Sequence, residues 1–341
     1  MQAHASLSHQ HRQFGWLAVS LLGSILAGTA CKPPVEARRQ GPAQQFTLTA
    51  DQTHNKFSRT IEPVLHVPSG AVIEAFTEEA SDGQITPESG ADVLLTLDFD
   101  LIHPLTGPVY VDGAQPGDIL AVTLHEIEIQ EWGWTAVVPG FGFLSEDFPD
   151  PYLKTFTFAA GATHAHFGRG IEIPLRPFPG VVAVAPDTDS LLSTIPPRAN
   201  GGNLDDRDLV AGTTIYFPVF VEGALFSIGD PHLAQGDGEV SGTAIEGPLR
   251  IVYEVNLIKN GRAMPAPQYE NEQYYAVTGY AETIDEATRN ATWAMIDYLV
   301  EEHGLERIEA YVLSSLAANL KIAEVVDVPH VLVTMRIRKD V

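Results

Sequence analysis

The chain has 341 residues, 45% of them hydrophobic, which is enough to bury one large core or two medium ones. Its formal net charge of −24 comes from 44 acidic and 20 basic residues, and the sequence shows no basic patch. So acidic a surface repels phosphate backbones, which excludes nucleic acid as a partner.

The first 31 residues have the pattern of an export signal. Arg12 is the only charged residue before an apolar run over residues 14–27, which is too short to span a membrane as a helix. Small residues then precede Cys31, the only cysteine, and this arrangement resembles a bacterial lipobox. We expect a signal peptide over 1–31, a lipid anchor at Cys31 and a polar tether over 32–45. An ordinary cleaved signal is the alternative, and either one predicts export to the bacterial cell envelope.

Residues 46–268 form a β-rich region that we expect to carry the catalytic site. Its short apolar runs are broken by Gly, Pro and Asp, and no helical period of helix length occurs. A mainly β fold of the sandwich or barrel kind is therefore expected. A six-residue echo between 109–114 and 219–224 indicates either a duplicated β unit or two similar hairpins. The runs expected to be strands are 72–76, 93–99, 109–111, 119–129, 181–185, 214–221 and 249–257.

Residues 269–341 change to a small α+β pattern that completes the same fold. A strand over 274–279 is followed by a helix over 284–303, where Asp285 suits the positive N-terminal end and Gly304 suits the stop. A second helix over 306–320 and a strand pair over 325–335 close the chain.

The densest run of polar side chains lies over Gly229–Glu239. It offers one imidazole, three carboxylates and a carboxamide, separated by glycines and a proline. Imidazole and carboxylate together are ligands for Zn²⁺ or Mn²⁺. The alternative is an acidic surface turn, because Asp-Gly is also a strong hairpin signal.

Five further polar clusters fall on expected turns of the β region, around His54, Asp82, His103, Trp134 and Asn203. Taken singly, each has a structural explanation, such as a surface histidine, a plain Asp-Gly turn or a tryptophan in the core. A serine nucleophile is disfavoured because the chain has no Gly-x-Ser-x-Gly elbow, and its only cysteine lies in the leader.

Long motifs in a consistent order resemble the acetamidase/formamidase family over residues 46–341. The resemblance implies hydrolysis of short aliphatic amides to carboxylate and ammonia at a metal-assisted site. It also implies a largely β fold and homo-oligomers built on dimers. The motifs are His54-Asn55, 80–86, 102–113, 116–118, 132–134, 138–142, 193–198, 201–203, 229–239, 295–299 and 325–329.

The resemblance assigns roles to these residues for cleaving an amide, which needs a nucleophile, a polarised carbonyl and a proton for the leaving amine. We expect a divalent metal, with zinc favoured and calcium or manganese as alternatives. The expected metal ligands are His54, Asp82, His103, Asp230 and His232. The expected catalytic carboxylates are Glu239 and Asp237, with Glu239 either a ligand or the proton shuttle. Asn55, Trp134, Asn203 and Gln235 are expected to bind the small amide substrate.

Phe57 and Ser58 stand where the family is expected to carry an aromatic residue and a second histidine. This departure leaves two alternatives open. The chain is either a hydrolase of larger or cyclic amides, or an exported lipoprotein that binds a small ligand without catalysis.

Overall fold

The computed structural model describes residues 45–341. The expected signal peptide, Cys31 and all but the last residue of the tether lie outside this range. Within it, no helix combines the length and apolar character needed to cross a membrane.

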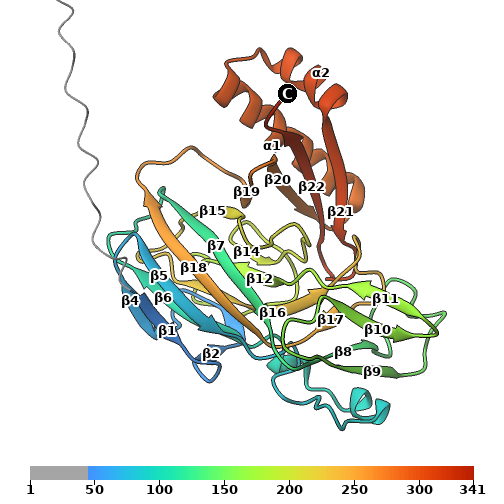
Figure 1. The fold of residues 1–341 in the computed structure, drawn as a ribbon. Coiled ribbons are helices and arrows are strands. Elements are labelled where there is room, and N and C mark those ends of the chain that lie inside the picture. Colours follow the sequence, from blue (N-terminus) through green and yellow to red (C-terminus); the bar gives the residue numbers. More distant parts are fainter. Residues whose placement is uncertain (1–44) are drawn as a thin grey trace, which may run out of the picture. The chain divides into compact units, whose positions relative to one another are not determined.

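Two nine-stranded sheets form the framework of the described chain (Figure 1). In the first, the long strands β7 (Ile119–Ile129) and β18 (Leu249–Ile258) are antiparallel neighbours, with Ile119 opposite Ile258. The first four residues of β7 are buried. In its second half, more buried side chains alternate with solvent-exposed ones, as the sequence predicts. In sheet order its strands are β1 (Gln45–Leu48), β5 (Ala71–Phe76), β18 (Leu249–Ile258), β7 (Ile119–Ile129), β15 (Thr214–Pro218), β19 (Gln268–Glu270), β20 (Tyr274–Ala281), β22 (Val331–Arg338) and β21 (Ala318–Glu324).

The second sheet has β16 (Phe226–Ala234) at its centre, buried along its whole length. Strands β12 (Phe178–Ala183), β6 (Leu105–Val111) and β17 (Ile245–Glu246) all pair with it in antiparallel orientation. The members are β14 (Gly201–Asn203), β12 (Phe178–Ala183), β16, β17 (Ile245–Glu246), β8 (Trp132–Val137) and β9 (Tyr152–Thr157), joined by β6 (Leu105–Val111), β2 (Thr53–His54) and β4 (Leu65–Val67). Two-stranded sheets pair β10 (His164–Gly168) with β11 (Ile171–Pro174), and β3 (Lys56–Phe57) with β13 (Leu192–Ser193).

The main hydrophobic core lies between the two sheets. Phe226 of β16 meets Tyr253 of β18 edge-on, with ring centroids 5.4 Å apart, and both side chains are fully buried. Phe217 of β15 packs on the same Phe226 ring at 5.7 Å. Aromatic contacts of this kind fix the sandwich and hold β16 as a rigid support.

Helices α1 (Ile284–His303) and α2 (Arg307–Ala317) pack on the last strands of the first sheet, and α1 lies on β20 and β22 (Figure 1). Gly279 of β20 permits this approach, because a Cβ there would lie 2.3 Å from the backbone nitrogen of Ala291. Thr283 caps the start of α1, and Gly304 ends it in the left-handed conformation at φ 65°.

The mainly β fold with a helical C-terminal part is confirmed. The expected strand over 93–99 is wrong, because this segment forms the short 3₁₀ helices η1 (Ala91–Leu95) and η2 (Phe99–Leu101). Its apolar residues are partly explained by Leu94, which is buried beside Trp134 in a separate small core. The second helix ends at Ala317, and the strand that follows begins at Ala318, before the expected 325.

Candidate active site

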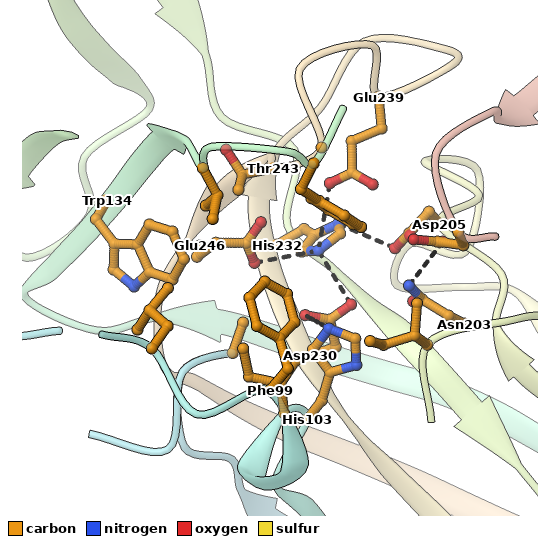
Figure 2. A pocket seen from close by; sticks show the side chains of 18 residues that line it. Phe99, His103, Trp134, Asn203, Asp205, Asp230, His232, Glu239, Thr243 and Glu246 are labelled. Atoms are coloured by element: carbon orange, nitrogen blue, oxygen red, sulfur yellow. Dashed lines mark hydrogen bonds and ion pairs between the residues drawn. The ribbon is translucent and has the colours of Figure 1, made fainter. Parts of the chain in front are cut away.

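The centre of the site lies on two neighbouring strands of the second sheet. Asp230 and His232 project from β16, and Glu246 comes from β17 (Figure 2). His232 Nε2 lies 3.1 Å from Glu246 Oε2 and 3.3 Å from Asp230 Oδ2. One imidazole nitrogen therefore faces two buried carboxylates.

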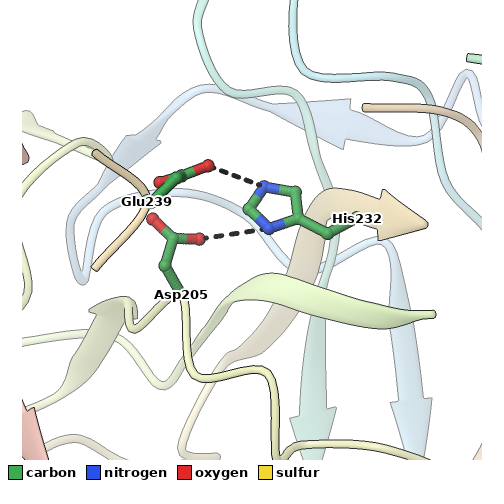
Figure 3. Close-up of side chains that lie close together, drawn as sticks. All are labelled: Asp205, His232 and Glu239. Carbon is green, nitrogen blue, oxygen red and sulfur yellow. Dashed lines mark ion pairs between the residues drawn. The ribbon is translucent and has the colours of Figure 1, made fainter. Parts of the chain in front are cut away.

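Loops add further carboxylates to the same point. Glu239, on the loop after β16, reaches 3.9 Å from His232 Nε2, and Asp205, after β14, lies 3.5 Å from His232 Nδ1 (Figure 3). Asp205, Asp230 and Glu239 all have positive φ values, of 40°, 51° and 44°. This left-handed conformation is uncommon for residues with a side chain and concentrates at functional sites.

Gln235 fixes the orientation of the His232 ring. Its side-chain nitrogen donates to the Asp205 carbonyl at 2.7 Å, so its Oε1 is left to face His232 Nδ1 at 2.8 Å. Because Oε1 can only accept, Nδ1 carries the proton. His232 Nε2 thus points its lone pair at carboxylates, and this position must hold either a proton or a cation.

The electrostatics of the cluster agree with this requirement. Burial by itself would lower the pKa of His232, but Glu246, Asp230 and Asp205 raise it well above its ordinary value. Burial, followed by the charge of Asp205, raises the pKa of Glu239 well above its ordinary value. No lysine or arginine lines the cavity over this cluster within residues 45–341. Among the described residues, no fixed positive charge of a lysine or arginine therefore balances the carboxylates in this cavity.

Gly180 of β12 provides the open floor of the cluster. A Cβ at this position would lie 2.4 Å from Asp205 Oδ1, 2.5 Å from Asp230 Oδ2 and 2.9 Å from His232 Cε1. Both oxygens of Asp205 and Oε2 of Glu246 are buried without a hydrogen-bond donor among the described residues. Such orphaned acceptors are costly unless a proton or cation satisfies them.

His103 and Asn203 complete the polar end of the cavity (Figure 2). His103 Nε2 lies 3.7 Å from Asp230 Oδ1, and its Nδ1 has no partner in the described chain. Asn203 donates its side-chain N–H to Asp327 at 2.8 Å, and its Oδ1 is also unpartnered. The site therefore keeps one free histidine nitrogen and one free amide oxygen.

Apolar side chains form the other wall of the cavity. It has about 50 Å³ of space open to water-sized molecules. A water needs roughly 10–15 Å³ on this measure, so the space holds about three to five non-hydrogen atoms. The apolar lining consists of Ala80, Leu97, Phe99, Ile102, Trp134, Val138, Phe141 and Ile195.

The structure brings His103, Asp230, His232 and Glu239 together and places His54 and Asp82 apart from them. His54 lies apart, with Nδ1 2.7 Å from the Lys56 carbonyl and Nε2 2.7 Å from Ser227 Oγ, so neither nitrogen is free for a metal. Asp82 is exposed on a turn. That turn wraps the buried carboxylate of Glu79, which accepts from the Gly83 backbone N–H at 2.7 Å.

Three other expected site residues have different surroundings from those expected. Asp237 is half exposed and faces Lys321 at 3.9 Å, outside the cavity. Gln235 lies behind His232, where it orients the ring and does not line the cavity. Asn55 donates to the Asp100 carbonyl at 2.7 Å, again away from the cavity. In each case a neighbouring backbone group or charge already satisfies the side chain.

Trp134 does line the cavity, as expected, and a buried carboxylate holds its ring. Its indole N–H donates to Glu79 Oε2 at 2.7 Å. Glu79 also accepts from Ser81 Oγ and from two backbone N–H groups of the 81–83 turn. The Ser-Asp-Gly motif is thus part of the support for the cavity wall.

Sequence reasoning missed Asp205, Glu246 and Asp327, which all face the cavity. Asp327 lies inside the 325–329 motif, and Asp205 lies two residues after the 201–203 motif. Proximity to these motifs is the signal that could have indicated both residues. Glu246 is the last residue of the two-residue strand β17, and no local sequence pattern marks it. The Phe57–Ser58 departure does not alter the cavity, because Phe57 is buried in another cluster and Ser58 bonds to Thr60 and Thr188.

The fold and site define a mainly β protein with a buried imidazole and carboxylate centre. The sequence pattern of the Acetamidase/Formamidase family matches residues 41–193 and 188–341. A Bacillus halodurans acetamidase structure has a TM-score of 0.81 and 32% identity, covering 86% of this chain and 97% of that one. The acetamidase of Mycolicibacterium smegmatis is 29% identical over 61% of this chain and 66% of its own length. A gamma lactamase from Delftia acidovorans has a TM-score of 0.62 and 26% identity, covering 85% and 89%.

The chain belongs to the Acetamidase/Formamidase family, so the expected family is confirmed. It is therefore an amidohydrolase acting on linear amides, and the expected enzyme class is confirmed as well.

Proposed function

We propose that this chain hydrolyses short-chain amides of the formamide and acetamide kind, and that it does so with a divalent metal. One observation carries the metal dependence: several buried carboxylates surround His232 Nε2, and no lysine or arginine of the described residues lines their cavity. Buried charges of one sign are stable only when paired, protonated or bound to a cation.

The chemistry of the donor set fits a metal. Ligand atoms of Asp230, His232 and Glu246 all lie within 4.8 Å of one another, and His103 adjoins them through Asp230. Gln235 behind the ring is the kind of outer hydrogen bond that orients a ligating histidine. We propose these four residues as the holders, with zinc favoured because nitrogen and carboxylate ligands suit it. Manganese and calcium are the alternatives.

A bound divalent cation would supply an acidified water and a Lewis acid for the amide carbonyl. The residues supply the remaining steps. Glu239 stands farther from His232 Nε2 than Asp230 and Glu246 do, and burial raises its pKa well above its ordinary value, which favours the protonated form. It is placed to pass that proton to the leaving nitrogen as ammonia departs. The free Oδ1 of Asn203 can accept an N–H of the amide, and Trp134 and Phe99 exclude water.

The size of the cavity supports a small substrate. Space for about three to five non-hydrogen atoms matches formamide or acetamide. An amide with a long or cyclic acyl group would need Phe99 or Phe141 to move.

Ammonia release from formamide, acetamide, propionamide and benzamide tests this proposal, using metal-replete protein with and without chelator. We expect turnover of the two smallest amides, loss with chelator and recovery with zinc. Absence of turnover of every amide by protein with a full metal complement would refute the proposal and would favour a non-catalytic binding role.

Hydrolysis of larger or cyclic amides is the second candidate. The similarity to the gamma lactamase of Delftia acidovorans favours it. A five-membered lactam in the same assay separates the two candidates, because the cavity as it stands predicts slower turnover of the lactam than of acetamide.

We also propose export with a lipid anchor at Cys31, and assembly as a homodimer or larger homo-oligomer. The leader sequence supports the first, and the family resemblance supports the second. Membrane fractionation of the full chain and of Cys31→Ser tests the anchor, because loss of the thiol should release the protein from the membrane. Light scattering tests the assembly.

A further inference from the structure

Arg207 is a half-buried arginine that has no ion pair and no side-chain hydrogen bond to any residue in the 45–341 range. This is unusual in a chain with 44 acidic residues and 20 basic ones. Its sequence neighbours Asp206 and Asp208 do not pair with it. Both bind Lys321, and Asp208 also binds Arg176 at 3.0 Å.

The Arg207 side chain lines two adjoining cavities. One has about 490 Å³ of space open to water-sized molecules and is also lined by Arg176, Gln235 and Glu239. The other has about 380 Å³ and is also lined by Arg176 and Arg336. Both are several times larger than the cavity over the catalytic cluster. They are within the range of small-ligand sites.

The charge of this region differs from that of the rest of the molecule. Arg336 binds Asp208, and Asp237 is the other carboxylate that lines the smaller of the two cavities. Three guanidinium groups thus face two carboxylates across that cavity, an excess of one positive charge. A guanidinium presents a planar fork that matches a carboxylate, and Arg207 has this fork free.

Glu239 connects this region to the catalytic cluster, because it lines both the catalytic cavity and the larger arginine-lined cavity. Amide hydrolysis releases a carboxylate anion beside the buried carboxylates Asp205, Asp230 and Glu246. Charge repulsion there favours its departure, and an anion that passes Glu239 meets Arg176 and Arg207 in the larger cavity.

We propose that Arg207, with Arg176, forms a binding site for a small carboxylate, in particular the acid that this enzyme releases. The catalytic cavity and the larger cavity of this site share Glu239 as a lining residue. The identity of the carboxylate as product rests on the proposed function, whereas the anion site itself rests on the free arginine and its cavity.

Arginine side-chain NMR of the metal-replete protein, titrated with acetate, tests the site without requiring turnover. Each Nε–Hε signal is assigned by its loss in a glutamine variant. We expect the Arg207 signal to shift and saturate. The exposed Arg289 on α1, which has no ion pair in the described chain, should not shift. An Arg207 signal that moves no more than that of Arg289, or that responds to inorganic phosphate but not to acetate, overturns the proposal.

Product inhibition supplies the second measurement. Arg207→Gln should weaken inhibition of amide turnover by acetate at least about tenfold, while Arg289→Gln, which removes the same charge, leaves it unchanged. Equal inhibition in both variants contradicts a product site even where the NMR shift is seen. If no amide is turned over, the proposed function fails and the NMR result still decides the anion site.

Discussion

The floor of the cluster can be closed by a single methyl group, through Gly180→Ala. The new Cβ would lie 2.4 Å from Asp205 Oδ1 and 2.5 Å from Asp230 Oδ2, where ordinary contacts begin at 3.4 Å. The two carboxylates must therefore retreat by about 1 Å (3.4 − 2.4 and 3.4 − 2.5). The Gly180 backbone does not have the positive φ that would strain alanine, so the strand itself tolerates the change.

A displacement of about 1 Å at a reacting group costs roughly 100-fold in rate. Because Asp230 is also a proposed ligand, we expect kcat/KM for acetamide to fall by at least about 100-fold and the metal content to fall with it. The cost in the free energy of unfolding should stay within about 1–3 kcal/mol, which is typical of one overpacked methyl group.

The assay measures ammonia release, metal per chain and thermal unfolding of Gly180→Ala beside Gly236→Ala. Gly236 lies on the Glu239 loop, has no heavy atom within 4 Å of its Cβ position and lacks a positive φ. It is a matched control that should keep activity and metal content. A folded Gly180→Ala protein with wild-type kcat/KM and full metal content would refute the proposed role of the cluster.

Three further predictions concern the surroundings of the cluster. Glu239→Gln should lower kcat by about 100-fold or more with metal content near normal, since it removes a proton donor and no proposed ligand; metal loss would make Glu239 a ligand. Gln235→Leu should weaken zinc affinity by about 10- to 100-fold in competition with a chelator, because His232 loses its orienting acceptor; unchanged affinity would contradict this role. Burial lowers the pKa of His54 to about 4, so its contribution to stability is present above pH 6.5 and is lost as the pH falls toward 4. Urea unfolding should therefore show a smaller stability difference between pH 7 and pH 4.5 in His54→Gln than in the wild type, and an equal difference would argue against this pKa.

The elements with a clear period could be predicted from the sequence. The alternating run of β7 and the capped helix α1 have the bounds that were expected, because local patterning and end signals act within a few residues. The segment over 93–99 was not predictable in this way, because its apolar residues fill a small core as a loop with 3₁₀ turns.

The sequence by itself determined the family, the mainly β fold and the Gly229–Glu239 segment as a candidate part of the site. Functional side chains that lie close together in the sequence can be recognised as a motif. Only the tertiary structure decided which polar groups converge: it added Asp205 and Glu246 and separated His54 and Asp82. The physical reason is that a hydrogen bond or charge partner distant in sequence fixes what each side chain can do. His54 contacts Ser227 and is neutral and satisfied, while Glu246 Oε2 faces His232 and has no donor among the described residues.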